Sequence, residues 1–472
     1  MNKQIIVLLA VVSFLGCREE TQTQIMETAT VKTLAPVSPE MMETGIIYEA
    51  NIRQYSPEGT FKAFTKDIPQ LKTLGVNTIW LMPVFPISET KRKATGGADS
   101  KFASEFPEAE QSKYLGSYYA VSDFTKINPE FGTIEDFRTL VKTAHENNIY
   151  VILDWVPNHT GWDHIWLKEH PEYYTQNEKG EVIHPKDTDW SDVADLNYEN
   201  QNMRNAMIDA MSYWITKENV DGFRCDVASS VPTDFWEQAI PKLRAQKDIF
   251  MLAEAWEPEL LKDGLFDMGY AWDRHHIMNA IAKGEQEATA WHAVIAQDSA
   301  RYEANDILMN FVTNHDENSW NGTIKERMGK ASEVMTALSY MTPGMPLIYS
   351  GQEYDLDHRL LFFEKDSFPH TKGNMWKILE KLGQLKVENE ALNGGKNAAA
   401  YKNLSDSKDV IAFSRTKGNN KVVFLANVTD APLKTNTPAT GKYTDYFSGE
   451  PIELKGVALA LKPWEYKILV SN

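Results

Sequence analysis

From Gly45 onward, short apolar runs rich in Ile, Val and aromatic residues alternate with longer stretches of helical periodicity. Alternating strands and helices form parallel sheets, and eight such units predict an α/β fold of the (β/α)₈ TIM-barrel type. The alternative is an open doubly wound sheet, but no Gly-rich phosphate loop follows the first run. The expected strands are Ile46–Ile52, Thr78–Met82, Tyr150–Trp155, Gly222–Asp226, Ile249–Glu254, Phe266–Ala271, Leu308–Asn314 and Pro346–Tyr349, with helices such as Ile134–Asn148, Met203–Glu218 and Lys330–Tyr340 between them.

Two connections, Ser88–Tyr118 and His159–Gln201, are too long to be simple turns. They follow the second and third expected strands, so they should stand over the C-terminal face of the barrel, where barrel active sites lie. After about Leu392, short strands separated by Gly, Asn, Asp and Pro predict a small antiparallel β-sandwich. The expected organisation is a barrel over 43–390, a short inserted domain over 159–201, and a C-terminal β-sandwich over 391–472.

The balance of charges narrows the class of ligand. The 472-residue chain has 48 Lys and Arg against 66 Asp and Glu, a net charge of −18. Such a surface repels phosphate backbones, which argues against nucleic acid and is compatible with a neutral carbohydrate. With 2 Cys, no disulfide framework is expected.

The N-terminus has the pattern of an export signal. A short basic start precedes an apolar run, Ile5–Leu15, that is too short to span a bilayer, and Gly16-Cys17 resembles a bacterial lipobox. We therefore expect a signal peptide over 1–17, lipidation at Cys17, and a flexible tether over 18–42. The protein would be exported and lipid-anchored, at the outer membrane or cell surface, with no other membrane contact. The alternative is an ordinary cleaved signal with an incidental Cys.

Polar clusters follow four of the expected strands. In a barrel these strand ends converge on one site, so four clusters together favour an active site over four separate capped strands. The clusters are Asp154-Trp155-Val156-Pro157-Asn158-His159, Arg224-Cys225-Asp226, Glu254-Ala255-Trp256 and Asn314-His315-Asp316.

The spacing of these carboxylates suits glycoside hydrolysis, in which one carboxylate attacks the anomeric carbon and another protonates the leaving oxygen. Arg224 and Asp226 are two apart on a strand and share a face, so the guanidinium should hold the carboxylate ionised as the nucleophile. Cys225 points the other way and should be a buried, inert thiol. Glu254, flanked by alanines, has the more apolar setting and is the natural acid.

The four clusters resemble the signature regions of the α-amylase family, glycoside hydrolase family 13, and further segments such as Leu74–Trp80 agree with it. The resemblance covers roughly Ile46 to Asn472. It implies Asp226 as nucleophile, Glu254 as general acid/base and Asp316 as the carboxylate that stabilises the transition state. It implies substrate-binding roles for Arg224, which supports the nucleophile, for Tyr119, which stacks on the sugar, and for His159 and His315, which bind its hydroxyls. The expected product retains its anomeric configuration, and the 159–201 insertion corresponds to the family's domain B.

The resemblance does not decide whether the protein binds a metal ion. Many family members bind Ca²⁺ between the barrel and domain B, and here Asn158 and Asp195 match two ligands, although the same side chains could hydrogen-bond loop backbone instead. No organic cofactor is expected.

The expected substrate is an α-glucan polysaccharide or oligosaccharide such as starch, glycogen or maltooligosaccharides, with cleavage of α-1,4 bonds. The Val227-Ala228 pair after the nucleophile extends the expectation to some α-1,6 bonds. Three alternatives stay open: a glucan transferase of the same family, a catalytically inactive barrel that binds glycans or a transporter, and a metal-dependent hydrolase. A glycan-uptake complex would be a natural partner.

Overall fold

The structure is a computed structural model that describes residues 34–97, 99–436, 439–456 and 458–471. The predicted signal peptide, its lipobox and Cys17 lie outside these residues, as does most of the predicted tether. Among the described residues, no helix combines the length and the apolar character needed to cross a membrane.

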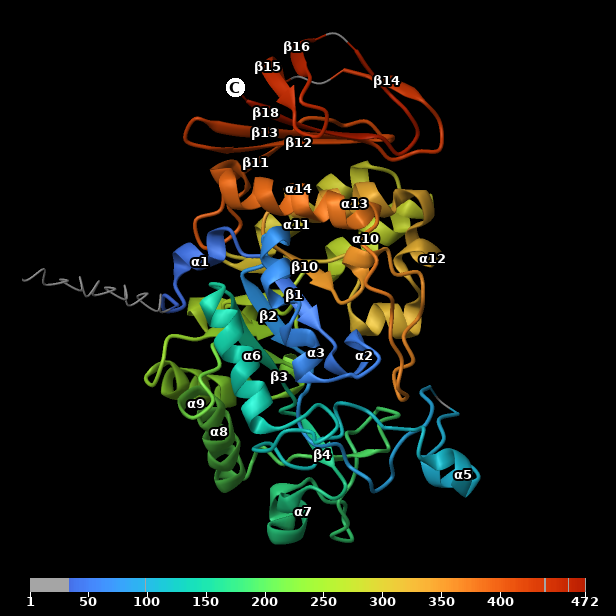
Figure 1. The fold of residues 1–472 in the computed structure, drawn as a ribbon. Helices are drawn as coiled ribbons and strands as arrows, with labels where there is room; N and C mark the ends of the chain where they lie inside the picture. The colour runs from blue at the N-terminus through green and yellow to red at the C-terminus, as the bar shows by residue number, and fades with distance from the viewer. Residues whose placement is uncertain (1–33, 98, 437–438, 457, 472) are drawn as a thin grey trace, which may run out of the picture. The chain divides into compact units, whose positions relative to one another are not determined.

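Eight parallel strands close into a barrel, which confirms the predicted fold (Figure 1). Around the barrel each strand pairs with the next, and the last pairs with the first, Ile47 lying opposite Leu347. Six of the eight strands end before the predicted runs do, and two end where predicted, at Trp155 and Tyr349. Asp226 and Glu254 therefore directly follow their strands and stand over the barrel mouth. The strands are β1 (Ile47–Ala50), β2 (Thr78–Leu81), β3 (Tyr150–Trp155), β6 (Gly222–Cys225), β7 (Phe250–Ala253), β8 (Met268–Tyr270), β9 (Ile307–Asn310) and β10 (Met345–Tyr349).

Helices cover the outside of the barrel, and the three helices predicted by position occur within a few residues of their expected bounds. One of them, α6, begins at a capping box in which Thr133 and Asp136 satisfy each other's backbone N–H groups. The α-helices are α1 (Pro39–Glu43), α2 (Ile52–Tyr55), α3 (Phe61–Thr65), α4 (Ile68–Leu71), α5 (Glu108–Gln111), α6 (Ile134–Glu146), α7 (Ile165–Glu169), α8 (Gln201–Thr216), α9 (Thr233–Arg244), α10 (Trp272–Ala282), α11 (Thr289–Arg301), α12 (Ile324–Met328), α13 (Ser332–Met341) and α14 (Asn374–Glu388).

The N-terminal residues of the described chain pack against the apolar core of the barrel strands, which corrects the predicted tether. Val37 and Met42 are buried in the same cluster as Ile47 and Trp80, and Tyr150 donates a hydrogen bond to the carbonyl of Pro36. A flexible tether therefore cannot extend through residues 34–42. The sequence pattern did not indicate this packing, because only a few apolar side chains, separated by Pro and Glu, make the contact.

The two long connections lie where the sequence placed them. The 159–201 insertion contains a two-stranded antiparallel sheet of β4 (His159–Gly161) and β5 (Val193–Asp195). The other connection, between β2 and α6, contacts this insertion through a hydrogen bond that the backbone N–H of Gly161 donates to the carbonyl of Val121. Both contribute residues to the lining of the site described below.

The C-terminal part is antiparallel, as predicted, with a six-stranded sheet in the order β11-β12-β13-β18-β15-β16 and a two-stranded sheet of β14 and β17. The buried guanidinium of Arg415 fastens this sheet to the barrel domain, since it donates to the carbonyls of Met341, Asn393 and Ala399. The strands are β11 (Ala400–Asn403), β12 (Val410–Lys417), β13 (Asn420–Asn427), β14 (Leu433–Thr435), β15 (Thr440–Asp445), β16 (Pro451–Lys455), β17 (Leu459–Leu461) and β18 (Tyr466–Ser471).

Candidate active site

A fully buried guanidinium, that of Arg224 at the end of β6, organises the barrel mouth. Its Nη1 lies 2.9 Å from Asp154 Oδ1 and 2.9 Å from Asp226 Oδ1, and its Nη2 lies 2.9 Å from Glu254 Oε2. Its Nε donates to the hydroxyl of Tyr270 at 3.2 Å. Three neighbouring strands thus bring three carboxylates to one cation. This confirms that Arg224 and Asp226 share a face, while Cys225 is buried on the other side.

These charges do not balance, and the imbalance determines where protons reside. Full ionisation would leave three negative charges around one positive charge. Burial raises the pKa of Asp154 to about 6 despite the opposing effect of Arg224. Burial and the charge of Glu254 raise the pKa of Asp226, again against Arg224. Burial thus outweighs Arg224 at both carboxyls, so Arg224 does not hold the pKa of Asp226 low as the sequence led us to expect.

The surroundings of Glu254 differ from the sequence expectation. Its Oε2 accepts a hydrogen bond of 2.7 Å from the backbone N–H of Val227 and lies beside Arg224, so the carboxyl is not in an apolar setting. Val227 has φ +37° and ψ 49°, a left-handed conformation that a β-branched residue rarely adopts and that costs of order 1–3 kcal/mol. This strained residue holds the proposed acid in place with its N–H.

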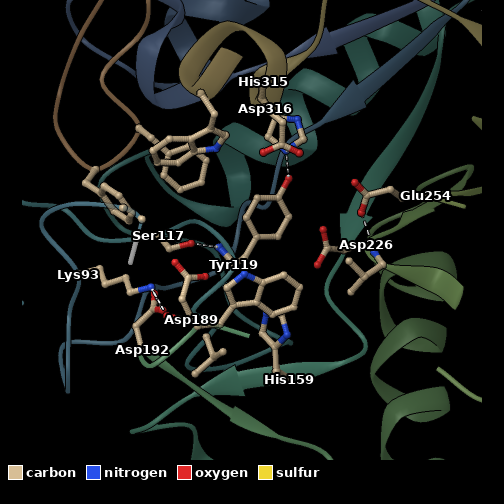
Figure 2. Close-up of a pocket in the computed structure, with 18 residues that line it drawn as sticks. Lys93, Ser117, Tyr119, His159, Asp189, Asp192, Asp226, Glu254, His315 and Asp316 are labelled. Carbon is tan, nitrogen blue, oxygen red and sulfur yellow. Dashed lines mark hydrogen bonds and ion pairs between the residues drawn. The ribbon is translucent and has the colours of Figure 1, made fainter. Parts of the chain in front are cut away.

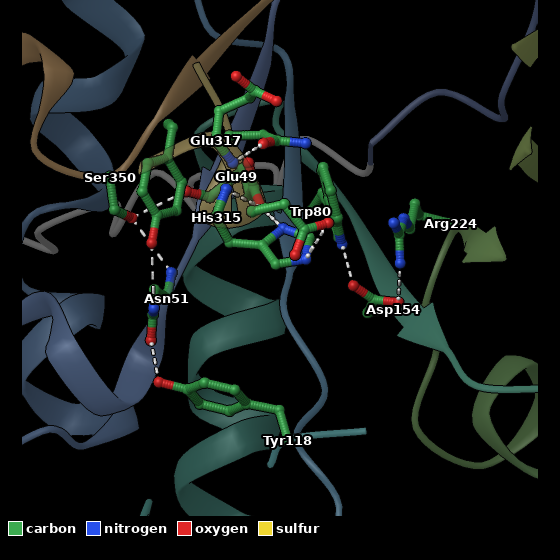
Figure 3. A network of polar contacts seen from close by, with 12 residues as sticks. Glu49, Asn51, Trp80, Tyr118, Asp154, Arg224, His315, Glu317 and Ser350 are labelled. Carbon is green, nitrogen blue, oxygen red and sulfur yellow. Dashed lines mark hydrogen bonds and ion pairs between the residues drawn. The ribbon is translucent and has the colours of Figure 1, made fainter. Parts of the chain in front are cut away.

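His315, after β9, contacts Glu49 on one side (Figure 3) and Tyr119 and Asp316 on the other. Its Nδ1 is 2.5 Å from Oε1 of the fully buried Glu49, and its Nε2 is 2.8 Å from the Tyr119 hydroxyl and 3.4 Å from Asp316 Oδ2. Burial alone would lower the pKa of His315, but Asp316 and Glu49 outweigh it and raise the pKa to about 9. His315 is therefore an imidazolium at neutral pH, held in orientation by Glu49.

The predicted site residues surround one pocket with a cavity volume of about 480 Å³ (Figure 2). The carboxylates Asp226, Glu254 and Asp316 line it, together with Tyr119, His159 and His315. Burial lowers the pKa of His159 to about 3, so this imidazole is neutral and, unlike His315, can accept a hydrogen bond. Arg224 lies beneath the pocket, behind the carboxylates that it contacts.

Several residues of the site were not assigned a role from the sequence. Asp154 joins Arg224 to Tyr119 and Trp80, both of which donate to its Oδ2. Glu49 orients His315, although it lies in the first strand, far away in sequence. The other pocket residues come from loops after β2, β3, β6, β9 and β10, namely Lys93, Gly96, Gly97, Ser117, Asp189, Trp190, Asp192, Val193, Val227, Trp320, Phe362 and Phe363.

The two predicted calcium ligands are neighbours at the edge of this site. The backbone carbonyl of Asn158 accepts a hydrogen bond from the backbone N–H of Leu196. Asp195 lies opposite His159 in the antiparallel pairing of β5 with β4. Burial raises the pKa of Asp195, and Thr175 hydrogen-bonds it. No group of three or more His, Cys, Asp or Glu suited to a metal occurs in the described part of the chain. One carboxylate and one amide fall short of the 6–8 oxygen ligands of Ca²⁺, so calcium here stays a prediction.

Comparison with known proteins agrees with this geometry. Residues 40–390 match the family model of the alpha amylase catalytic domain, and residues 401–463 match that of the alpha amylase C-terminal all-beta domain. The chain belongs to the alpha-amylase family. A solved structure of similar fold is the maltogenic alpha-amylase AmyB of Thermotoga neapolitana, which is 28% identical, with a TM-score of 0.79 over 91% of this chain and 98% of that one. Another is an alpha-amylase of Lactobacillus plantarum, which is 27% identical, with a TM-score of 0.79 over 92% of this chain and 100% of that one.

Curated relatives within the alpha-amylase family are longer than this chain. The alpha-amylase MalA of Haloarcula japonica is 25% identical over 88% of this chain but 59% of its own length. The intracellular maltogenic amylase of Bacillus subtilis is 26% identical over 87% of this chain and 69% of its own length. The chain therefore spans about three fifths of the length of the first relative and about two thirds of the second.

Glu49→Gln tests the electrostatic role of the buried carboxylate. The substitution removes a negative charge from His315, so the pKa of that imidazole should fall below about 9. Because the folded pKa exceeds the unfolded value of about 6.5, His315 stabilises the fold below pH 6.5 and loses that contribution as the pH rises through 9. Urea unfolding of the variant should therefore show a smaller loss of stability between these pH values than wild type.

The matched control is Glu110→Gln, whose side chain is about half exposed and does not line the pocket. It should leave the pH dependence of unfolding as in wild type. An NMR titration in which His315 has the same pKa in wild type and Glu49→Gln would contradict the assignment.

Proposed function

We propose that this protein is a retaining α-glucan hydrolase that cleaves α-1,4 glucosidic bonds of starch, glycogen or maltooligosaccharides. The observation that carries the proposal is the Arg224 cluster, in which Asp226 and Glu254 contact the two terminal nitrogens of one guanidinium. Carboxyl groups at such close range suit the covalent route of retaining enzymes, because inverting enzymes hold theirs further apart to admit a water molecule. Family membership and the names of the relatives support the same chemistry.

In the proposed reaction, the Asp226 carboxylate forms a bond to the anomeric carbon while Glu254 donates its proton to the glycosidic oxygen. The carbon–oxygen bond breaks, and the leaving sugar departs with a new hydroxyl. Glu254, now ionised, takes a proton from water, whose oxygen attacks the same carbon and releases Asp226. Two displacements at one carbon retain its configuration.

The other residues of the pocket stabilise the positive charge that develops on the sugar and hold its hydroxyls. Tyr119 offers the face of its ring. Asp316, whose side chain is 36% exposed, is a pocket carboxylate that Arg224 does not contact, so it can face the developing charge. The His315 imidazolium can only donate hydrogen bonds, whereas neutral His159 can also accept one. A transferase would use the same residues with a sugar hydroxyl in place of water, so product analysis must decide between them.

Asp226→Asn should abolish turnover and leave the fold intact, since it removes the nucleophile without changing the volume of the side chain. We expect the rate on maltooligosaccharides to fall by a factor of about 10⁴ or more. Asp430→Asn, at an exposed position between β13 and β14, is the matched control and should keep wild-type activity. A folded Asp226→Asn variant with a tenth of the wild-type rate would refute the assignment.

The linkage preference follows from Val227, which borders Glu254 and the pocket. An α-1,6 bond has one more rotatable carbon, so the leaving sugar needs different room rather than different catalytic groups. A single apolar contact discriminates by about 1–3 kcal/mol, so we propose that α-1,4 cleavage is accompanied by slower α-1,6 cleavage. An NMR time course should show α-anomeric products from maltooligosaccharides and, from panose, the maltose that α-1,6 cleavage releases rather than isomaltose alone. Intact panose beside rapid cleavage of amylose would leave strict α-1,4 specificity.

The proposed location is the outer membrane or cell surface, through lipid on Cys17. Stable anchoring requires at least two lipid chains, and an exported, anchored glycosidase would supply short glucans to a glycan-uptake complex. In the native host, wild-type protein should partition with membranes, whereas Cys17→Ser should be released or remain unprocessed. Equal soluble fractions of the two proteins would indicate an ordinary cleaved signal.

A further inference from the structure

The two ends of the pocket hold different parts of a bound glucan. Glu254 protonates the oxygen that leaves, so the leaving sugar must lie on the Glu254 side of Asp226. The sugar that is attacked lies over Asp226, Tyr119 and His315, and any unit on its non-reducing side must extend away from Glu254. In Figure 2 that direction leads toward Lys93, Asp189 and Asp192. The residues at that end of the pocket determine whether a long glucan chain can extend through it.

The first closing contact joins the connection after β2 to domain B. Lys93 is buried, and its Nζ donates to the carbonyl of Asp189 at 2.7 Å and lies 3.5 Å from Asp192 Oδ1. Asp192 is buried as well, so an ion pair shielded from water holds the two loops together. A buried pair of this kind is costly to break, because each partner would be left unpaired.

The second closing contact joins the same connection to the loops after β9 and β10. A Cβ atom built on Gly96 would lie 2.8 Å from the ring of Trp320 and 3.5 Å from that of Phe363, so the glycine backbone packs directly against these rings. The two rings lie 5.9 Å apart. Nearby, the N–H of Leu115 donates to the carbonyl of Phe363 at 2.7 Å, which fixes this loop to the connection.

One connection therefore bridges both sides of the barrel mouth, at Lys93 and at Gly96, and the residues that make these contacts also line the pocket. From this we infer that the pocket is blind on the side away from Glu254, and that the enzyme takes α-glucans by their non-reducing ends and releases short products. This exo action rests on the proposed function and adds the mode of attack. We define the closing wall as Lys93, Gly96, Asp192, Trp320 and Phe363.

The direct test compares two 4-nitrophenyl α-maltoheptaosides, one with a free non-reducing end and one whose terminal glucose carries a 4,6-O-ethylidene group, with products separated by chromatography. The blocked end should clash with the closing wall, so the wild-type enzyme should cleave the blocked substrate about 100-fold more slowly than the free one. Rates within about threefold of each other would overturn the inference. Failure to cleave either substrate would instead refute the proposed function, and the inference with it.

Substitutions in the closing wall test whether its residues cause the difference in rate between the blocked and the free substrate. Trp320→Ala opens one closing contact and Lys93→Ala the other, so each should raise the ratio of blocked to free cleavage by about tenfold. Trp256→Ala is the matched control, because Trp256 is 40% exposed and is not among the residues that line the pocket. Its ratio should equal that of wild type. Folded Trp320→Ala and Lys93→Ala variants that both keep the wild-type ratio would show that the wall does not set the mode of attack.

Discussion

The chemistry of this protein depends on one buried cation surrounded by an excess of carboxylates. Arg224 has no exposure to solvent and contacts Asp154, Asp226 and Glu254 at hydrogen-bonding distance. A buried guanidinium is tolerated only when it is paired, and buried carboxylates stay ionised only beside a cation. Burial raises the pKa of Asp154 and of Asp226 even beside this cation, so the cluster resists full ionisation. The barrel supplies this arrangement because neighbouring parallel strands end at the same place.

A second layer of polar groups orients the residues that face the sugar. Asp154 accepts hydrogen bonds from Trp80 and Tyr119 while it contacts Arg224. Glu49 holds one side of His315, and Tyr119 contacts the other. The pocket thus has a cationic His315 and a neutral His159 on rigid supports, so their hydrogen bonds need little rearrangement during the reaction.

The sequence predicts the barrel and its carboxylates well because both depend on local patterns: strand periodicity, and polar residues directly after strands. Contacts between segments that are far apart in the sequence cannot be predicted from such local patterns. The sequence gives no reason to pair Glu49 with His315 or Lys93 with Asp192. It also misplaced the start of the folded domain, since Val37 and Met42 make few but buried contacts. The apolar neighbours of Glu254 were misleading because adjacent residues at a strand end point to opposite faces, so they say little about the surroundings of its carboxyl.

The central claim is that Asp226 attacks the sugar while Glu254 serves as acid and base, and trapping the covalent intermediate tests it most directly. A 5-fluoro-α-glucosyl fluoride has a leaving group that needs no acid, and its glycosyl-enzyme hydrolyses slowly. On Glu254→Gln, mass spectrometry after digestion should find one added fluoroglucosyl group on the peptide that contains Asp226. A label on the peptide with Asp154 or Asp316, or release of fluoride with no label at all, would contradict the account.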